Sequence, residues 1–310
     1  MDLQDNSSDS DKYREPTLAW IKKSGYPLEM EVARKFHRAE IFIDVSRQYE
    51  DLLEKVNRET DVVASWPIFG KRSEDGKSVR FAEFHFVVEC KSTGAPWAAF
   101  LHDTENMEEY DESLIMADMP NNFGNLEVPA CAHAAYENLE PFSKFKNLSY
   151  AIRQKKNDDK PGGDKAYNAL RQAASAALGL SARSDQLPEL FIPLVVINSP
   201  LYECFLTSSG ELDLRQTKFA SQIVNLSDEL SALVLISHID GLDKLISDMQ
   251  GVVDSYAQNE RVFREPWIPE RIQDYYPPSV FESRYAPAIY VRKFLLDLQS
   301  VLHDPPPLTE

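Results

Sequence analysis

The sequence has few of the features that mark secreted, zinc-finger or membrane proteins. It contains three cysteines in 310 residues, and none belongs to a CxxC pair, so we expect neither a disulfide framework nor a cysteine-rich zinc site. No apolar run approaches the roughly 20 residues that a membrane-spanning helix needs. The polar, acidic N-terminus lacks the basic start and apolar segment of a secretory signal. We therefore expect a cytoplasmic protein without a membrane partner.

Positive charge is also scarce. Lysine and arginine total 33 against 50 aspartates and glutamates, which gives a formal net charge of −17. Proteins that bind nucleic acid usually carry a basic surface, because neutralised phosphates drive affinity. The charge weakens a nucleic-acid partner without excluding one, since basic residues cluster locally. Arg34, Lys35 and Arg38 form one such cluster, which is either a phosphate-contacting surface or a solvated helix face.

Hydrophobic periodicity predicts an α/β domain in which helices cover a sheet. Within the expected core, apolar residues at helical spacing favour two helices, and alternating or continuous apolar runs favour four strands; a further strand is expected at 232–237 and a further helix at 242–256. Short polar connections between the first three strands predict an antiparallel meander. In chain order, we expect a helix over 28–39, strands over 41–49, 61–66 and 83–91, a helix over 164–179 and a buried strand over 190–198.

Composition divides the chain into three parts. Residues 1–16 are polar and acidic, which predicts a disordered tail. Residues 17–210 form the predicted core, with an insertion at about 103–160 that shows no strong period. Residues 211–310 are expected to be a C-terminal extension packed on that core.

The stretch EFHFVVECKS at residues 83–92 carries the first chemical signal. Glu89 and Lys91 share one face of the predicted strand, because successive strand residues alternate in direction. A carboxylate beside an ammonium group at the end of a buried strand can hold a divalent cation and a water together. The alternative is a half-exposed ion pair of little energetic value. His85 shares this face, and we interpret it as a solvated strand residue.

A hard cation needs further oxygen ligands, and the sequence offers two. Asp61 opens the neighbouring predicted strand and lies beside Glu89 if the two strands pair. Glu29 shares the helix face of the apolar residues that follow it, whereas Glu31 lies on the basic face. Periodicity therefore selects Glu29 as the third carboxylate. Its other interpretation is a favourable acid in the first turn of the helix.

The order of these residues resembles the PD-(D/E)xK, or restriction-endonuclease-like, nuclease superfamily. The resemblance rests on SGYPLEMEVARKF around Glu29, RETDVVAS around Asp61 and VVECKSTGAPW around Glu89 and Lys91. It covers residues 17–101 best, and the later helix and strand fit the rest of the core less specifically. Thr60 stands where the family motif has proline.

The resemblance implies a metal-dependent phosphodiester hydrolase, an endonuclease that acts on nucleic acid, with DNA favoured over RNA. Asp61, Glu89 and the backbone carbonyl of Cys90 would bind Mg²⁺ or Mn²⁺, and Glu29 would hold a metal-bound water or a second ion. Lys91 would orient or deprotonate the attacking water. A homodimer or a protein partner is left open. The alternative is a catalytically inactive nuclease-like module that mediates interactions within a larger complex.

Overall fold

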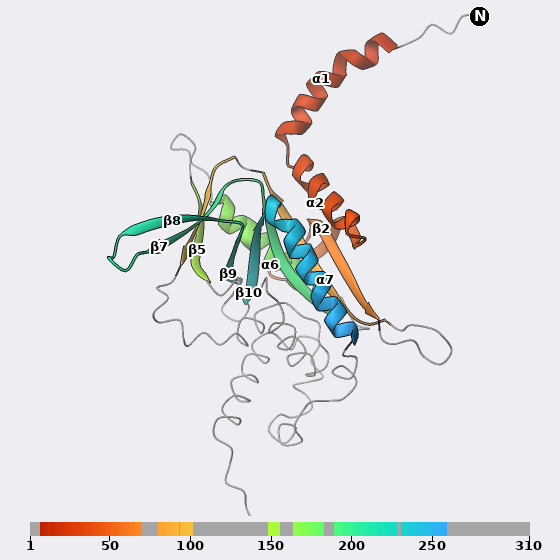
Figure 1. Cartoon of the computed structure of the whole chain (residues 1–310). Helices are drawn as coiled ribbons and strands as arrows, with labels where there is room; N and C mark the ends of the chain where they lie inside the picture. Colours follow the sequence, from red (N-terminus) through yellow and green to blue (C-terminus); the bar gives the residue numbers. More distant parts are fainter. Residues whose placement is uncertain are drawn as a thin grey trace, which may run out of the picture.

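The computed structural model describes residues 7–69, 80–92, 94–101, 148–155, 164–182, 189–227 and 231–258. These residues form two sheets and four α-helices in a mixed α/β arrangement (Figure 1). The helices are α1 (Ser7–Lys23), α2 (Tyr26–Arg38), α6 (Lys165–Ser181) and α7 (Leu242–Gln258), with a short 3-10 helix at Ile239–Gly241. None of the described helices is long and apolar enough to cross a membrane.

The main sheet has six strands in the order β1-β2-β3-β6-β10-β9. The first three pair antiparallel, as the sequence predicts, whereas β6 lies parallel to both β3 and β10. The antiparallel β9 forms the far edge. The bounds are β1 (Phe42–Asp51), β2 (Val56–Phe69), β3 (Arg80–Lys91), β6 (Glu189–Ile197), β9 (Phe219–Asn225) and β10 (Ser231–His238).

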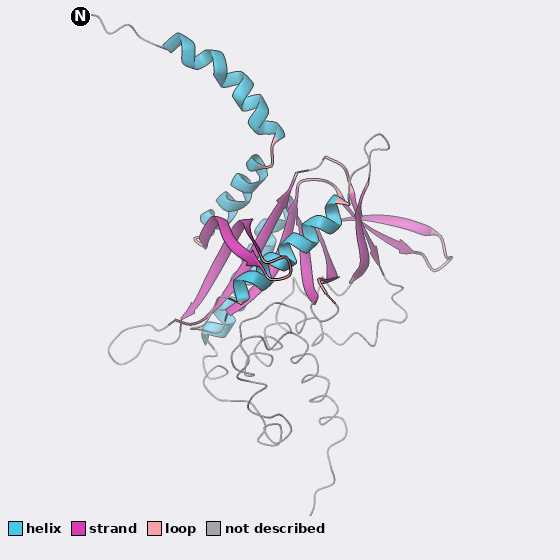
Figure 2. Ribbon diagram, turned by 180° about the vertical axis from the view of Figure 1, so that it is seen from behind, coloured by secondary structure: helices cyan, strands magenta, loops and turns pink. Residues whose placement is uncertain are grey.

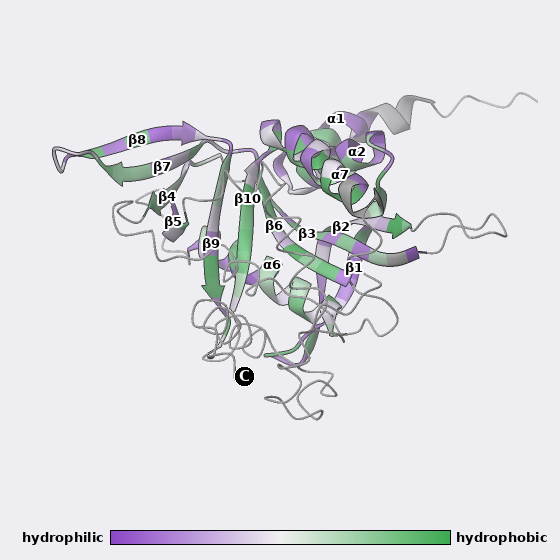
Figure 3. Ribbon diagram, turned by 60° about the horizontal axis from the view of Figure 1, so that its bottom comes forward, coloured by the Kyte–Doolittle hydropathy of each residue, from purple (hydrophilic) through white to green (hydrophobic). Residues whose placement is uncertain are grey.

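Helices cover both faces of this sheet. α2 and α7 pack on one face, and α6 packs on the other (Figures 1 and 2). An aromatic group of Phe36, Trp66 and Phe86 lies at the centre of the first layer, with ring centroids 5.2–6.4 Å apart. Strands β6 and β10 are buried on both sides, which explains their nearly continuous apolar sequences (Figure 3).

A second sheet of four strands has the order β5-β4-β7-β8. Its inner residues, including the fully buried Trp97, share an apolar cluster with the alanine-rich side of α6. Trp97 is therefore a core residue. The β7–β8 hairpin projects from the body of the molecule (Figure 1). The bounds are β4 (Trp97–Leu101), β5 (Ser149–Gln154), β7 (Leu201–Leu206) and β8 (Leu212–Thr217).

The boundary between the first two strands lies elsewhere than the sequence predicts. The sequence predicts strands over 41–49 and 61–66, but residues 57–59 already belong to β2, and the turn lies at 52–55. The carboxylate of Asp51 nucleates that turn by accepting hydrogen bonds from the backbone N–H groups of Leu53 and Glu54. Asp61 consequently lies inside β2 instead of at its start.

Three boundaries also differ from the prediction. The tail expected to be disordered through residue 16 forms α1 from Ser7 onward. Part of the expected insertion, Ser149–Gln154, is strand β5, while residues 102–147 and 156–163 lie outside the described residues. Strands β9 and β10 lie beyond residue 210 but complete the main sheet, so the core does not end there.

Candidate active site

The pairing of β2 with β3 brings two of the predicted acidic residues together. Val62 lies opposite Val88, so the next position along this antiparallel register places Asp61 beside Glu89. The hydroxyl of the preceding residue, Thr60, donates a hydrogen bond to the Val88 carbonyl at 3.1 Å. Thr60 is fully buried and ties the two strands together directly before the site.

Asp61 is fixed by the backbone of the neighbouring strand. Its Oδ2 accepts a hydrogen bond from the Cys90 N–H at 2.6 Å. Burial raises the pKa of Asp61, while this hydrogen bond and the nearby Lys91 act against the rise. One carboxylate oxygen of Asp61 is therefore held by the backbone of β3.

Glu89 is the most deeply buried of the three predicted carboxylates, with 6% of its surface exposed. The Lys91 ammonium donates a hydrogen bond to its Oε1 along the same strand face. The pKa of Glu89 is raised to about 7, chiefly by burial and then by the charge of Asp61, while Lys91 acts against the rise. The predicted ion pair is present, but its acid is almost entirely withdrawn from solvent, unlike that of an ordinary surface pair.

Glu29 reaches the same electrostatic neighbourhood from α2. It lies in the first turn of the helix, so the helix dipole alone accounts for an acid here. Its pKa is raised by burial and then by Asp61, while Lys91 lowers it. The dipole does not explain this coupling to Asp61. The helix face that carries Glu29 buries Leu28, Val32 and Phe36, as the periodicity predicts.

The electrostatics of this group suit a bound cation. Three carboxylates share one ammonium group, and Asp61 raises the pKa of both of the other acids. An additional positive charge would relieve this repulsion, and a set of carboxylate oxygens is what Mg²⁺ prefers. The Asp61 bond to the Cys90 N–H shows how that residue contacts the site; a role for its carbonyl stays a prediction.

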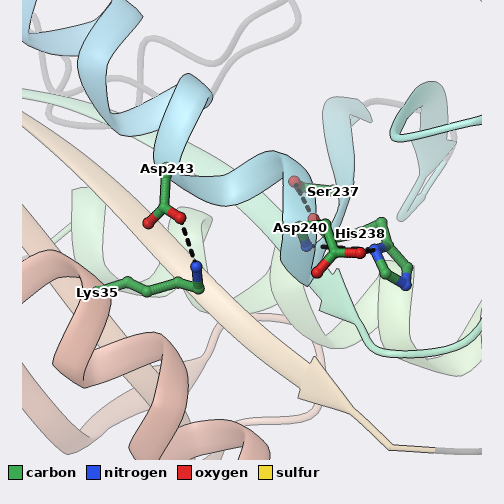
Figure 4. Close-up of polar contacts among 5 residues, drawn as sticks. All are labelled: Lys35, Ser237, His238, Asp240 and Asp243. Atoms are coloured by element: carbon green, nitrogen blue, oxygen red, sulfur yellow. Dashed lines mark hydrogen bonds and ion pairs between the residues drawn. The ribbon is translucent and has the colours of Figure 1, made fainter.

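The three basic residues on α2, Arg34, Lys35 and Arg38, do not share one environment in the structure. Arg34 and Arg38 are exposed. Lys35 instead forms an ion pair with Asp243 of α7, with Nζ 2.6 Å from Oδ2, and its side chain is mostly buried (Figure 4). Lys35 therefore links two helices, because its ammonium group already has a carboxylate partner.

A second buried polar group, which the sequence analysis missed, lies near the other end of β3. The ligand atoms of Glu83, His85 and Glu189 lie within 4.8 Å of one another, the one such group of three or more His, Cys, Asp or Glu residues among the described residues. Glu29, Asp61 and Glu89 do not form a set as compact as this. The interpretation of His85 as solvated is wrong, because the residue is buried beneath the α6 face. The sequence signal for this group is the pair of polar residues at 83 and 85, which lie on the same face of β3.

In comparisons with known proteins, no family model matches the chain, and no curated protein or solved structure shows a significant match.

Proposed function

We propose that this chain is a metal-dependent phosphodiester hydrolase that acts on nucleic acid, DNA more readily than RNA, and that its fold is a restriction-endonuclease-like core. Support for the fold comes from the order of its elements. The helix α2 precedes the antiparallel strands β1, β2 and β3, and α6 then leads to β6, which lies parallel to β3. This is the helix, meander, helix and strand order that the resemblance implies.

One observation carries the proposal: Asp61 accepts a hydrogen bond from the Cys90 N–H, directly beside the buried Glu89–Lys91 pair. A surface ion pair needs neither the burial nor the second carboxylate. A site for a hard divalent cation needs the second carboxylate, since such ions bind several oxygens held in fixed positions. Asp61 lies within β2 and is fixed through its side chain by the Cys90 N–H, and Glu89 lies within β3, where it pairs with Val195 of β6.

The residues divide the chemistry between them. Asp61 and Glu89 would hold the cation, and the electrostatically coupled Glu29 would hold a further water or a second ion. A bound Mg²⁺ or Mn²⁺ supplies an electrophile that polarises the phosphoryl oxygen and favours ionisation of a water. Lys91 donates a hydrogen bond to the attacking water and stabilises the negative charge that develops on the phosphate. Arg34 and Arg38 on the exposed side of α2 contact backbone phosphates.

The test is cleavage of plasmid DNA, single-stranded DNA and RNA with Mg²⁺ or Mn²⁺. Asp61→Asn and Lys91→Met keep the approximate shape of each side chain but remove its charge. We expect each to reduce cleavage by at least about 100-fold, and EDTA to abolish it. Asp213→Asn, at an exposed position on β8, is the matched control and should retain full activity. Equal cleavage by all four proteins would refute the assignment.

A catalytically inactive interaction module is the second candidate. The net charge of −17 favours it, as does the capture of Lys35 by Asp243, which removes one positive charge from the basic cluster. It predicts no cleavage and no binding of Mn²⁺ at Asp61 and Glu89. Calorimetric titration of Mn²⁺ into the full chain and into Asp61→Asn distinguishes the two, because an active site binds the ion only when Asp61 is present.

A further inference from the structure

The imidazole of His85 has two contacts, one through its ring face and one through Nδ1, whereas its Nε2 has no hydrogen-bond partner among the described residues. It is 4% exposed, and its ring stacks on Phe191 with centroids 4.4 Å apart. Its Nδ1 lies 2.8 Å from the Ser65 hydroxyl oxygen on β2. The buried Nε2 has no hydrogen-bond partner among the described residues. A buried polar atom in this condition is costly unless something else occupies its lone pair or proton.

Two carboxylates face that nitrogen. Glu83 and Glu189 lie opposite each other in the parallel register of β3 and β6. Like charges in directly opposed strand positions are destabilising. The Glu189 Oε1 lies 3.7 Å from the His85 Nε2, which is too long for a hydrogen bond. The separation suits two atoms that each bind a shared zinc ion at about 2.1 Å.

The surroundings provide the outer contacts that such a site requires. When the His85 Nδ1 carries the hydrogen, it donates to Ser65, which leaves the Nε2 lone pair for a metal. The Arg80 guanidinium donates a hydrogen bond to the Glu83 Oε2 at 2.8 Å. That bond orients the carboxylate and leaves its second oxygen as a ligand atom.

We propose that Glu83, His85 and Glu189 form a divalent transition-metal site of the zinc class, separate from the Asp61 and Glu89 group. One imidazole and two carboxylates are a ligand set that suits Zn²⁺ better than the all-oxygen environment of Mg²⁺. The ion joins the beginning of β6 to β3 and, through Ser65, to β2. Its role is structural, because it neutralises opposed carboxylates and fixes the pairing of strands that are distant in sequence.

The experiment uses the full chain carrying Asp61→Asn, so that binding at the proposed catalytic site does not contribute. Zn²⁺ is titrated calorimetrically, and Co²⁺ is titrated by visible absorption. We expect one Zn²⁺ per chain, and at least about a tenfold loss of affinity in His85→Gln and in Glu189→Gln. Circular dichroism verifies that each variant folds. Glu211→Gln, an exposed glutamate in the β7–β8 hairpin, is the control and should bind as tightly as its parent.

X-ray absorption of the zinc-loaded protein gives a measurement that does not depend on variants. The expected first shell contains nitrogen and oxygen only, with one imidazole. A sulfur ligand would assign the ion to a cysteine and overturn the proposal. Failure to bind Zn²⁺, or unchanged affinity in both folded variants, would overturn it as well. Nuclease activity is not part of this readout, so the two proposals stand or fail separately.

Discussion

Replacement of Glu89 by glutamine should stabilise the metal-free protein at alkaline pH. The pKa of Glu89 rises from an ordinary 4.5 to about 7 in the folded chain, chiefly through burial. The fold therefore favours the protonated carboxyl, which glutamine resembles in shape and charge. Each unit of pKa difference corresponds to about 1.4 kcal/mol, so the full difference amounts to about 3 kcal/mol.

The sign follows from proton linkage. Because the folded pKa is raised, the contribution of Glu89 to stability is fully present below about pH 4.5 and is lost as the pH rises through about 7. Glutamine does not ionise and loses nothing. The variant should thus match the wild type near pH 4 and exceed its free energy of unfolding by about 3 kcal/mol at pH 8.

Urea denaturation in EDTA at the two pH values measures this difference. Glu211→Gln serves as the control, since surface substitutions usually change stability by less than about 0.5 kcal/mol. Addition of Mg²⁺ should stabilise only the wild type and narrow the gap, because ligand binding to the folded state adds to its stability. A destabilised variant at pH 8, or a difference that does not depend on pH, would refute the burial argument.

Three further substitutions test the packing around the proposed active site by urea denaturation. Gly179→Ala would place a Cβ 2.3 Å from the Glu50 carbonyl oxygen, so we expect a loss of about 1–3 kcal/mol; a neutral effect would contradict this close approach. Thr60→Val removes the hydrogen bond to Val88 and should cost about 1 kcal/mol, and a more stable protein would argue against that bond. Phe36→Ala should cost about 3–5 kcal/mol, whereas a loss below about 1 kcal/mol would mean that the aromatic group is loosely packed.

Short-range patterns predicted the central part of the fold. The apolar alternation that ends at Lys91 predicted strand β3, although both of its faces are buried, and the helical period selected Glu29 because one side of α2 is apolar. The pairing of β2 with β3 followed from the short connection between them. These signals depend on neighbours within a few residues, so one sequence suffices to read them.

Other features depend on partners that are distant along the chain. β9 and β10 join the sheet only through β6, and no local pattern states which strand pairs with which. In β8, Leu212 and Leu214 alternate with polar residues, yet both leucines are exposed, so the local pattern does not show how this strand is buried. His85 looked solvated because the stacking ring of Phe191 comes from β6, far away in sequence. The proposed zinc site could not be predicted from the sequence for the same reason: Glu189 lies near His85 only because β6 pairs in parallel with β3.

The parallel pairing of β3 with β6 also has a consequence for synthesis on the ribosome. All four residues of the proposed hydrolytic centre are translated by position 91, yet the strand that flanks β3 begins only at Glu189. Until β6 emerges, β3 has an open edge and the acidic group lacks its protein surroundings. The nascent polypeptide thus contains every residue of the proposed centre well before β6 can complete the surroundings of that centre, so any activity of the proposed centre would begin only after most of the chain has been made.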